Sequence, residues 1–189
     1  SAQFTKLNGR AQLQYRISGL AFKVRGNAGT SYGPNRLPAQ DQFRAEGASP
    51  RERFSNDILR SGRDFATFTR RYAEGGGNLR GYVGQALAVE KYATANFELG
   101  PSRPIFGLHW FGFYDAGKLW PVSGIGATNR ANAGFGASFL GGLSQFFGGN
   151  LPVFESLSAR IYFPIWLSDP LPGEKQTQYR WYFSIGKQL

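Results

Sequence analysis

The feature that most constrains this chain is a regular alternation of apolar and polar residues along several long segments. A period of two places alternate side chains on opposite faces of an extended strand. Many of these segments reach the roughly ten residues that a tilted strand needs to cross a bilayer. The pattern therefore predicts an all-β protein with about seven strands. They cover approximately residues 7–17, 20–33, 86–100, 107–120, 132–142, 157–167 and 179–189.

Strand length and aromatic placement separate two all-β architectures. A soluble β-sandwich also alternates, but its strands are usually shorter, about five to six residues. The four tryptophans, together with several tyrosines, lie toward the ends of predicted strands, as in the aromatic girdles of membrane barrels. A mean hydropathy of -0.35 is compatible with a membrane barrel, because polar residues that face the lumen lower the mean. We therefore expect a transmembrane antiparallel β-barrel. The tryptophans are Trp110, Trp120, Trp166 and Trp181.

The predicted number of strands leaves the closure of this barrel open. Single-chain bacterial barrels have an even number of strands, from eight upward, and lipid does not tolerate an open sheet edge. An eighth strand within residues 63–73 would give an 8-stranded barrel. Alternatively, the chain supplies the last seven strands of a larger barrel, or a partner chain completes it.

A polar, arginine-rich segment interrupts the alternation, and we expect a long loop at about residues 33–84. Loops of this length inside a compact domain usually serve a function. One short helix is predicted within it, with Ser49 as the N-cap, Pro50 in the first turn and Gly62 at the end. The segment ends in the stretch GGGNLRGY, residues 75–82.

The composition argues against several classes of function. The net charge of +10 raises the question of nucleic acid, but the basic residues are scattered over strands and a loop. The chain has no cysteine for a thiolate metal site, and His109 is its only histidine, without a G-x-S-x-G nucleophile motif. We therefore predict no enzyme activity, no catalytic residue, no cofactor, no metal site and no nucleic-acid partner.

Four segments carry a resemblance to a known family. GGGNLRGY resembles the (V/L)-R-G-(F/Y) loop motif of the BamA superfamily, the bacterial surface antigens, which are 16-stranded outer-membrane barrels. ANFELG is similar to the strand after the motif, which carries an inward Glu, FGFYDAGKLW to the next strand, and YRWYFSIGKQL to the last strand. The resemblance covers about residues 7–189, the C-terminal seven strands. The first barrel half and the substrate-recruiting periplasmic domains are missing, and the chain ends in Leu189 where many such proteins end in an aromatic residue.

The resemblance implies a loop that folds into the barrel lumen, with its arginine on acidic residues of the wall. Carried onto this chain, Arg80, flanked by Gly81 and Tyr82, would contact Glu98 and Asp115. Both carboxylates lie on the polar face that the alternation gives their strands, and a guanidinium fork can bind two carboxylates. This contact is expected to act as a stabilising latch, with direct contact to a substrate as the alternative.

Two further sets of residues have implied roles. Glycines preceding the arginine are expected to form a hinge that lets the loop turn sharply; they are Gly75, Gly76 and Gly77. The last strand is expected to form one side of a weak barrel seam, locally weakened by its glycine. The residues of this seam strand are Phe183, Ile185, Gly186 and Leu189.

By resemblance, the chain inserts, assembles or translocates proteins at the bacterial outer membrane. The implied partners are the lipid bilayer with its lipopolysaccharide, and other assembly proteins or the missing barrel half. An alternative function is an anchor that holds a fused peptidase or patatin-like enzyme at the cell surface, without insertase activity. A third reading is a small ligand-binding β protein.

Overall fold

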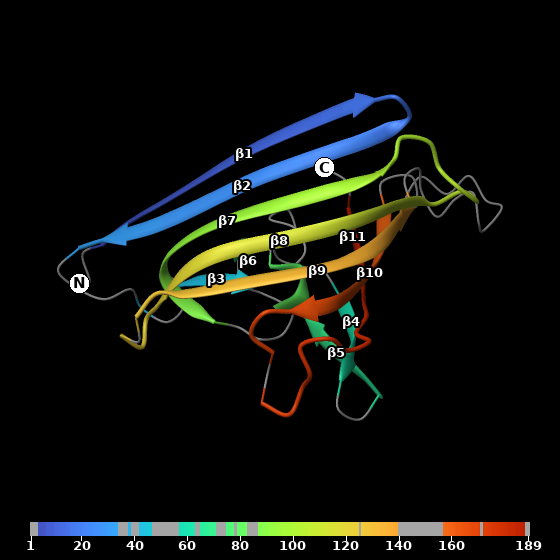
Figure 1. Ribbon diagram of the computed structural model, residues 1–189. Helices are drawn as coiled ribbons and strands as arrows, with labels where there is room; N and C mark the ends of the chain where they lie inside the picture. Colours follow the sequence, from blue (N-terminus) through green and yellow to red (C-terminus); the bar gives the residue numbers. More distant parts are fainter. Residues whose placement is uncertain are drawn as a thin grey trace.

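The computed structural model describes a single, strongly curved antiparallel sheet (Figure 1). It describes residues 4–33, 38, 42–46, 57–62, 65–70, 75–77, 79–82, 87–124, 126–139, 157–170 and 172–187. Six strands are 11 to 14 residues long, as expected from the alternation, and a shorter seventh follows. These are β1 (Thr5–Ile17), β2 (Leu20–Tyr32), β7 (Ala88–Pro101), β8 (His109–Pro121), β9 (Thr128–Phe139), β10 (Leu157–Leu167) and β11 (Tyr182–Lys187).

The seven strands pair with their neighbours in chain order, so the chain meanders up and down across the sheet. The connection between β1 and β2 is a two-residue turn at Ser18 and Gly19, both with positive φ. This is the backbone that a tight hairpin needs to match the twist of its strands. Among the described residues no pairing joins β1 to the far side of the sheet, so the sheet is open.

The predicted loop at residues 33–84 contains short strands, which corrects its description as a loop with one helix. They are β3 (Phe43–Glu46), β4 (Asp57–Gly62), β5 (Phe65–Arg70) and β6 (Gly75–Gly77). Residues predicted to end a helix form β4, which pairs with β5, and β5 lies inside the segment considered for an eighth strand. Ser49 and Pro50 lie outside the described residues. Backbone pairing along the hairpin outweighs the local helix signals.

The last strand is not an open edge in this structure, and its role as one side of a weak barrel seam stays a prediction. β11 pairs with β10 on one side and with β4 on the other, through Tyr182 to Ser184. An unpaired strand presents a row of free N–H and C=O groups, and β4 satisfies several of them. At the opposite end of the sheet, β1 pairs only with β2 among the described strands.

The two faces of the long strands differ in chemistry. We call the face that carries Asp115 the inner face and the opposite one the outer face. The inner face holds polar side chains and two buried apolar clusters, of which the larger surrounds Tyr82. The outer face exposes large apolar side chains. They include Leu7, Leu13, Tyr15, Ile17, Phe22, Val24, Phe97, Leu99, Trp110, Tyr114 and Phe135.

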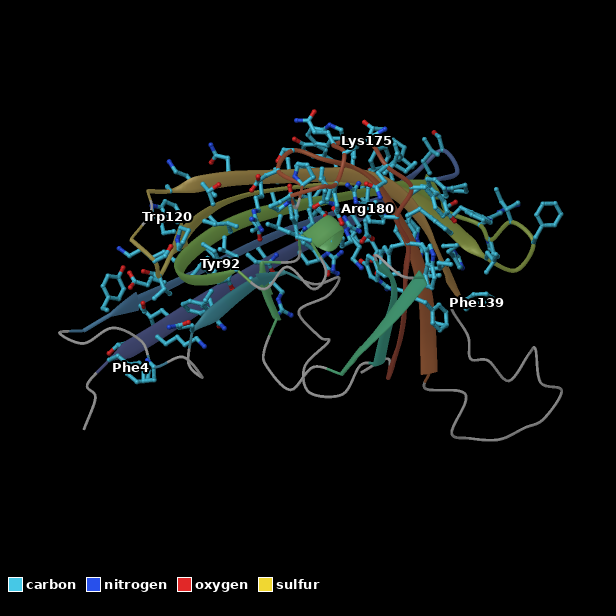
Figure 2. The ribbon with its side chains drawn as sticks, turned by 90° about the horizontal axis from the view of Figure 1, so that it is seen from below. Phe4, Tyr92, Trp120, Phe139, Lys175 and Arg180 are labelled. Atoms are coloured by element: carbon cyan, nitrogen blue, oxygen red, sulfur yellow. The ribbon has the colours of Figure 1, made fainter. Side chains whose placement is uncertain are left out.

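Figure 2 shows the arch of the sheet from below, with Trp120 and Phe139 toward opposite ends of the strands. Within the described part of the chain, no helix has the length and apolar character needed to cross a membrane.

Candidate functional site

The candidate site is built around a single 3₁₀ turn, η1 (Arg80–Tyr82), which lies against the inner face of the sheet (Figure 2). The turn is closed by a hydrogen bond of 3.1 Å from the N–H of Tyr82 to the carbonyl of Leu79. Leu79 is fully buried in the larger apolar cluster, where it anchors the start of the turn. All three residues of η1 are buried, so the segment is a packed element and not a surface loop.

Arg80 is bound by the carboxylate of Asp115 on β8. The Arg80 Nε atom lies 3.1 Å and 2.9 Å from the two carboxylate oxygens, and Nη2 donates to Oδ1. The backbone N–H of Arg80 donates to Oδ2 as well, at 3.1 Å. Both side chains are fully buried. The guanidinium fork therefore meets its carboxylate side by side, the geometry for which arginine is suited.

Asp115 is held by two asparagines in addition to the arginine. Asn96 of β7 and Asn132 of β9 each donate an amide hydrogen to it over 2.9 Å. Asp115 is the register partner of both asparagines, and Arg25 of β2 is opposite Asn96 in the same row. One polar row thus crosses four adjacent strands. A buried carboxylate with this many donors has its charge compensated and its position fixed.

Glu98 is the second carboxylate, and two arginines share it. Its Oε1 atom lies 2.6 Å from Nη1 of Arg80 and 2.6 Å from Nη2 of Arg25. Arg80 also lies over the ring of Phe113, with 4.2 Å between the guanidinium carbon and the ring centroid. Burial alone lowers the pKa of Arg80, but the charge and hydrogen bonds of Asp115, followed by Glu98, raise it above its usual value. Arg80 is therefore charged at neutral pH.

Tyr82 and Gly81 complete the docked turn. The Tyr82 hydroxyl donates to the carbonyl of Ala131 at 3.1 Å and accepts from the N–H of Asp169 at 3.2 Å. Gly81 faces Leu167 and Asn132 so closely that a Cβ atom would overlap both side chains. The turn can approach the wall only because this position has no side chain.

The sequence-predicted residues thus divide into two groups. The structure brings Arg80, Gly81, Tyr82, Glu98 and Asp115 together. The other predicted residues that the structure describes lie elsewhere in the fold.

The hinge and seam residues lie apart from this site. Gly75–Gly77 do not form a turn; they are extended as β6 and pair in parallel with β3, a correction of the hinge prediction. Ile185 and Gly186 lie in β11 opposite β10, and Phe183 also pairs with Leu59 of β4. Leu189 lies outside the described residues. The glycines are extended because the backbone of β3 supplies hydrogen-bond partners for them.

Sequence reasoning missed several members of the site. Alternation gives the polar face of a strand, but it does not give the register between strands. The register is what aligns Arg25, Asn96 and Asn132. Within the described residues, no group of three or more potential ligands could hold a metal ion. His109 lies at the start of β8, and the described contacts of Arg80 do not include it.

The fold and site define an all-β protein in which a buried arginine turn is docked on the inner face of an open antiparallel sheet. Comparisons of the chain with protein families, with curated proteins and with solved structures found no match.

Proposed function

We propose that the chain is the C-terminal part of an outer-membrane β-barrel of the BamA type, which takes part in inserting, assembling or translocating proteins there. The observation that carries the proposal is the docking of the R-G-Y turn: Arg80 binds Asp115 and Glu98 on the inner face of the sheet. The motif and both of its acidic partners stand in the order that the family resemblance implies. In this proposal the inner face lines the barrel lumen, and the segment before Tyr82 is extracellular.

The chemistry of the outer face supports a membrane location. Soluble monomers rarely expose an apolar surface that extends over five strands. Trp110 and Trp120 are both exposed on this face of β8 and stand ten residues apart. Ten residues span about 33 Å along a strand, or about 25 Å across the bilayer at a tilt of about 40°. That height matches the apolar band of a membrane barrel.

Basic residues lie beside aromatic rings at one end of this band. The Lys118 ammonium is 5.5 Å from the ring centroid of Trp120, and Lys91 is 5.9 Å from that of Tyr32. Lys91 and Trp120 are also register partners on β7 and β8. Aromatic rings at the headgroup level, with lysines reaching lipid phosphates, are typical of a membrane interface.

A charge placed on the outer face tests the membrane location. Leu13 is 68% exposed and shares a cross-strand row with Val24, Phe97 and Tyr114, about midway between the two tryptophans. Leu13→Arg is expected to destabilise the chain folded in lipid vesicles by about 2–4 kcal/mol, because the charge enters hydrocarbon. The measurement is urea unfolding in vesicles.

The neighbouring residue provides the matched control for this substitution. Gln12 is exposed on the opposite face of β1, so Gln12→Arg is expected to change stability by less than about 1 kcal/mol. Equal midpoints for the Leu13→Arg and Gln12→Arg variants would contradict a lipid-facing outer surface.

An insertion assay separates the insertase from an anchor. Vesicles that contain the full chain are expected to accelerate the folding of a urea-unfolded outer-membrane barrel, compared with empty vesicles. The Arg80→Ala variant, present at an equal inserted amount, is expected to accelerate it less, because the docked turn holds the lumen wall in shape. A chain that inserts normally but gives the rate of empty vesicles would instead be an anchor.

A further inference from the structure

A second polar site lies on the inner face, separate from the contacts of Asp115. A cavity of about 320 Å³ is lined by polar side chains from six successive strands of the sheet. It lies toward the end of the sheet that carries the Ser18–Gly19 turn, since Ala21, Pro101 and Ser102 also line it. The polar lining residues include Arg16, Lys23, Glu98, His109, Ser138 and Arg160.

The strand register brings five of these side chains together in two rows. Lys23 of β2 is opposite Glu98 of β7. His109 of β8 is opposite Ser138 of β9, which in turn is opposite Arg160 of β10. Because register partners on one face have neighbouring Cβ atoms, each row presents its polar groups to the same space. The cavity is therefore a product of the pairing of the whole sheet.

Positive charge exceeds negative charge in this cavity. Three basic side chains line it, and Glu98 is the only carboxylate among the described residues of its lining. Glu98 is already bound at 2.6 Å by both Arg25 and Arg80, which lie outside the lining. None of the ion pairs in the described part of the chain includes Lys23. A partly enclosed space with this excess of positive charge favours an anion.

We propose that this cavity binds a phosphate group, carried by a small soluble molecule or by a lipid headgroup. The tetrahedral oxygens of a phosphate can accept hydrogen bonds from several directions at once. Lys23 and Arg160 would supply charge-assisted hydrogen bonds from opposite sides, and the Ser138 hydroxyl would donate a further one. The volume lies at the lower end of the range for small-molecule sites. This inference goes beyond the proposed function and holds for either the insertase or the anchor.

The test is a calorimetric titration of the full chain, folded in detergent micelles, with inorganic phosphate. Wild-type protein is expected to bind phosphate, and Lys23→Gln to bind it at least ~10-fold more weakly, the effect of losing one charge-assisted hydrogen bond. Lys23→Arg, which keeps the charge, is expected to bind within a few-fold of wild type. Lys118→Gln removes a strand lysine outside this cavity and is expected to bind normally.

Folding of each variant is checked by the heat-dependent shift of its band in gel electrophoresis. Absence of phosphate binding by the folded wild type, or equal affinities for Lys23→Gln and Lys118→Gln, would overturn the site. If wild type binds, mixed micelles with phosphatidic acid then identify the source. Displacement of inorganic phosphate assigns a lipid headgroup, and unchanged binding assigns a soluble phosphate. The titration needs no insertion activity, so its failure is distinct from failure of the insertion assay.

Discussion

Replacing Arg80 with alanine is expected to lower the free energy of unfolding by about 3–5 kcal/mol, because Asp115 then stays buried without its counter-charge. The loss also removes the cation–π contact with Phe113 and one of the two cations on Glu98. Asn96 and Asn132 would still donate to Asp115, but neutral amides do not compensate the charge. The measurement is urea unfolding of the folded chain in detergent or vesicles.

Two further variants define what Arg80 contributes. Arg80→Lys keeps the charge but cannot reproduce the fork that binds both carboxylates, so we expect a loss between those of wild type and alanine. Arg103→Ala serves as the control, because Arg103 is exposed in the connection between β7 and β8. Its expected effect is within about 0.5 kcal/mol. Unfolding of Arg80→Ala at the urea midpoint of Arg103→Ala would contradict a stabilising role for the docked arginine.

Replacing Tyr82 with alanine is the second change with a large expected effect, a loss of about 3–5 kcal/mol, as for other large buried aromatic residues. The Tyr82 side chain is fully buried with Leu79, Val89 and Leu167. The guanidinium carbon of Arg130 also lies 4.8 Å from the centroid of its ring. A cavity at this position would loosen the turn that presents Arg80. Unfolding in urea measures the loss.

A smaller change separates the ring from the hydroxyl. Tyr82→Phe keeps the ring and is expected to cost about 1–3 kcal/mol, because it leaves the Asp169 N–H without its partner, whereas the Ala131 carbonyl still accepts from the N–H of Ser168. Tyr179→Ala is the control, since this tyrosine is 68% exposed. The expected order of stability is Tyr179→Ala, then Tyr82→Phe, then Tyr82→Ala. If Tyr82→Ala were as stable as Tyr179→Ala, the turn would not be part of the core.

Alternation predicted the long strands well because it is a local property of the chain. β1, β2, β8 and β10 begin and end within a few residues of the segments that the pattern defined. The segment between β2 and β7 was not predictable in this way. Its strands are short, and β3 and β4 each have one partner, β7 and β11 respectively, that lies far along the chain. The prediction of a helix end at Gly62 was therefore wrong, because Gly62 lies in β4.

The candidate site was predictable in part, because the motif and the alternation within each strand are local properties of the chain. The motif indicated Arg80, and strand parity with the family resemblance indicated Glu98 and Asp115 as its partners. Arg25 and Asn132 could not be predicted, because their place beside these residues depends on register across neighbouring strands. A shift of one residue would move either side chain to the other face. The hinge role of Gly75–Gly77 was wrong, because pairing with β3 extends them.

The polar row across β2, β7, β8 and β9 has a consequence for the order of folding. The binding site for Arg80 does not exist on any one strand, since Asp115 is positioned by Asn96 and Asn132 from both sides. Only one alignment of these strands assembles it. We therefore expect η1 to dock late, after the strands have paired in the correct register. Docking of Arg80 therefore stabilises only the correctly aligned sheet, because a misaligned sheet offers no complementary site.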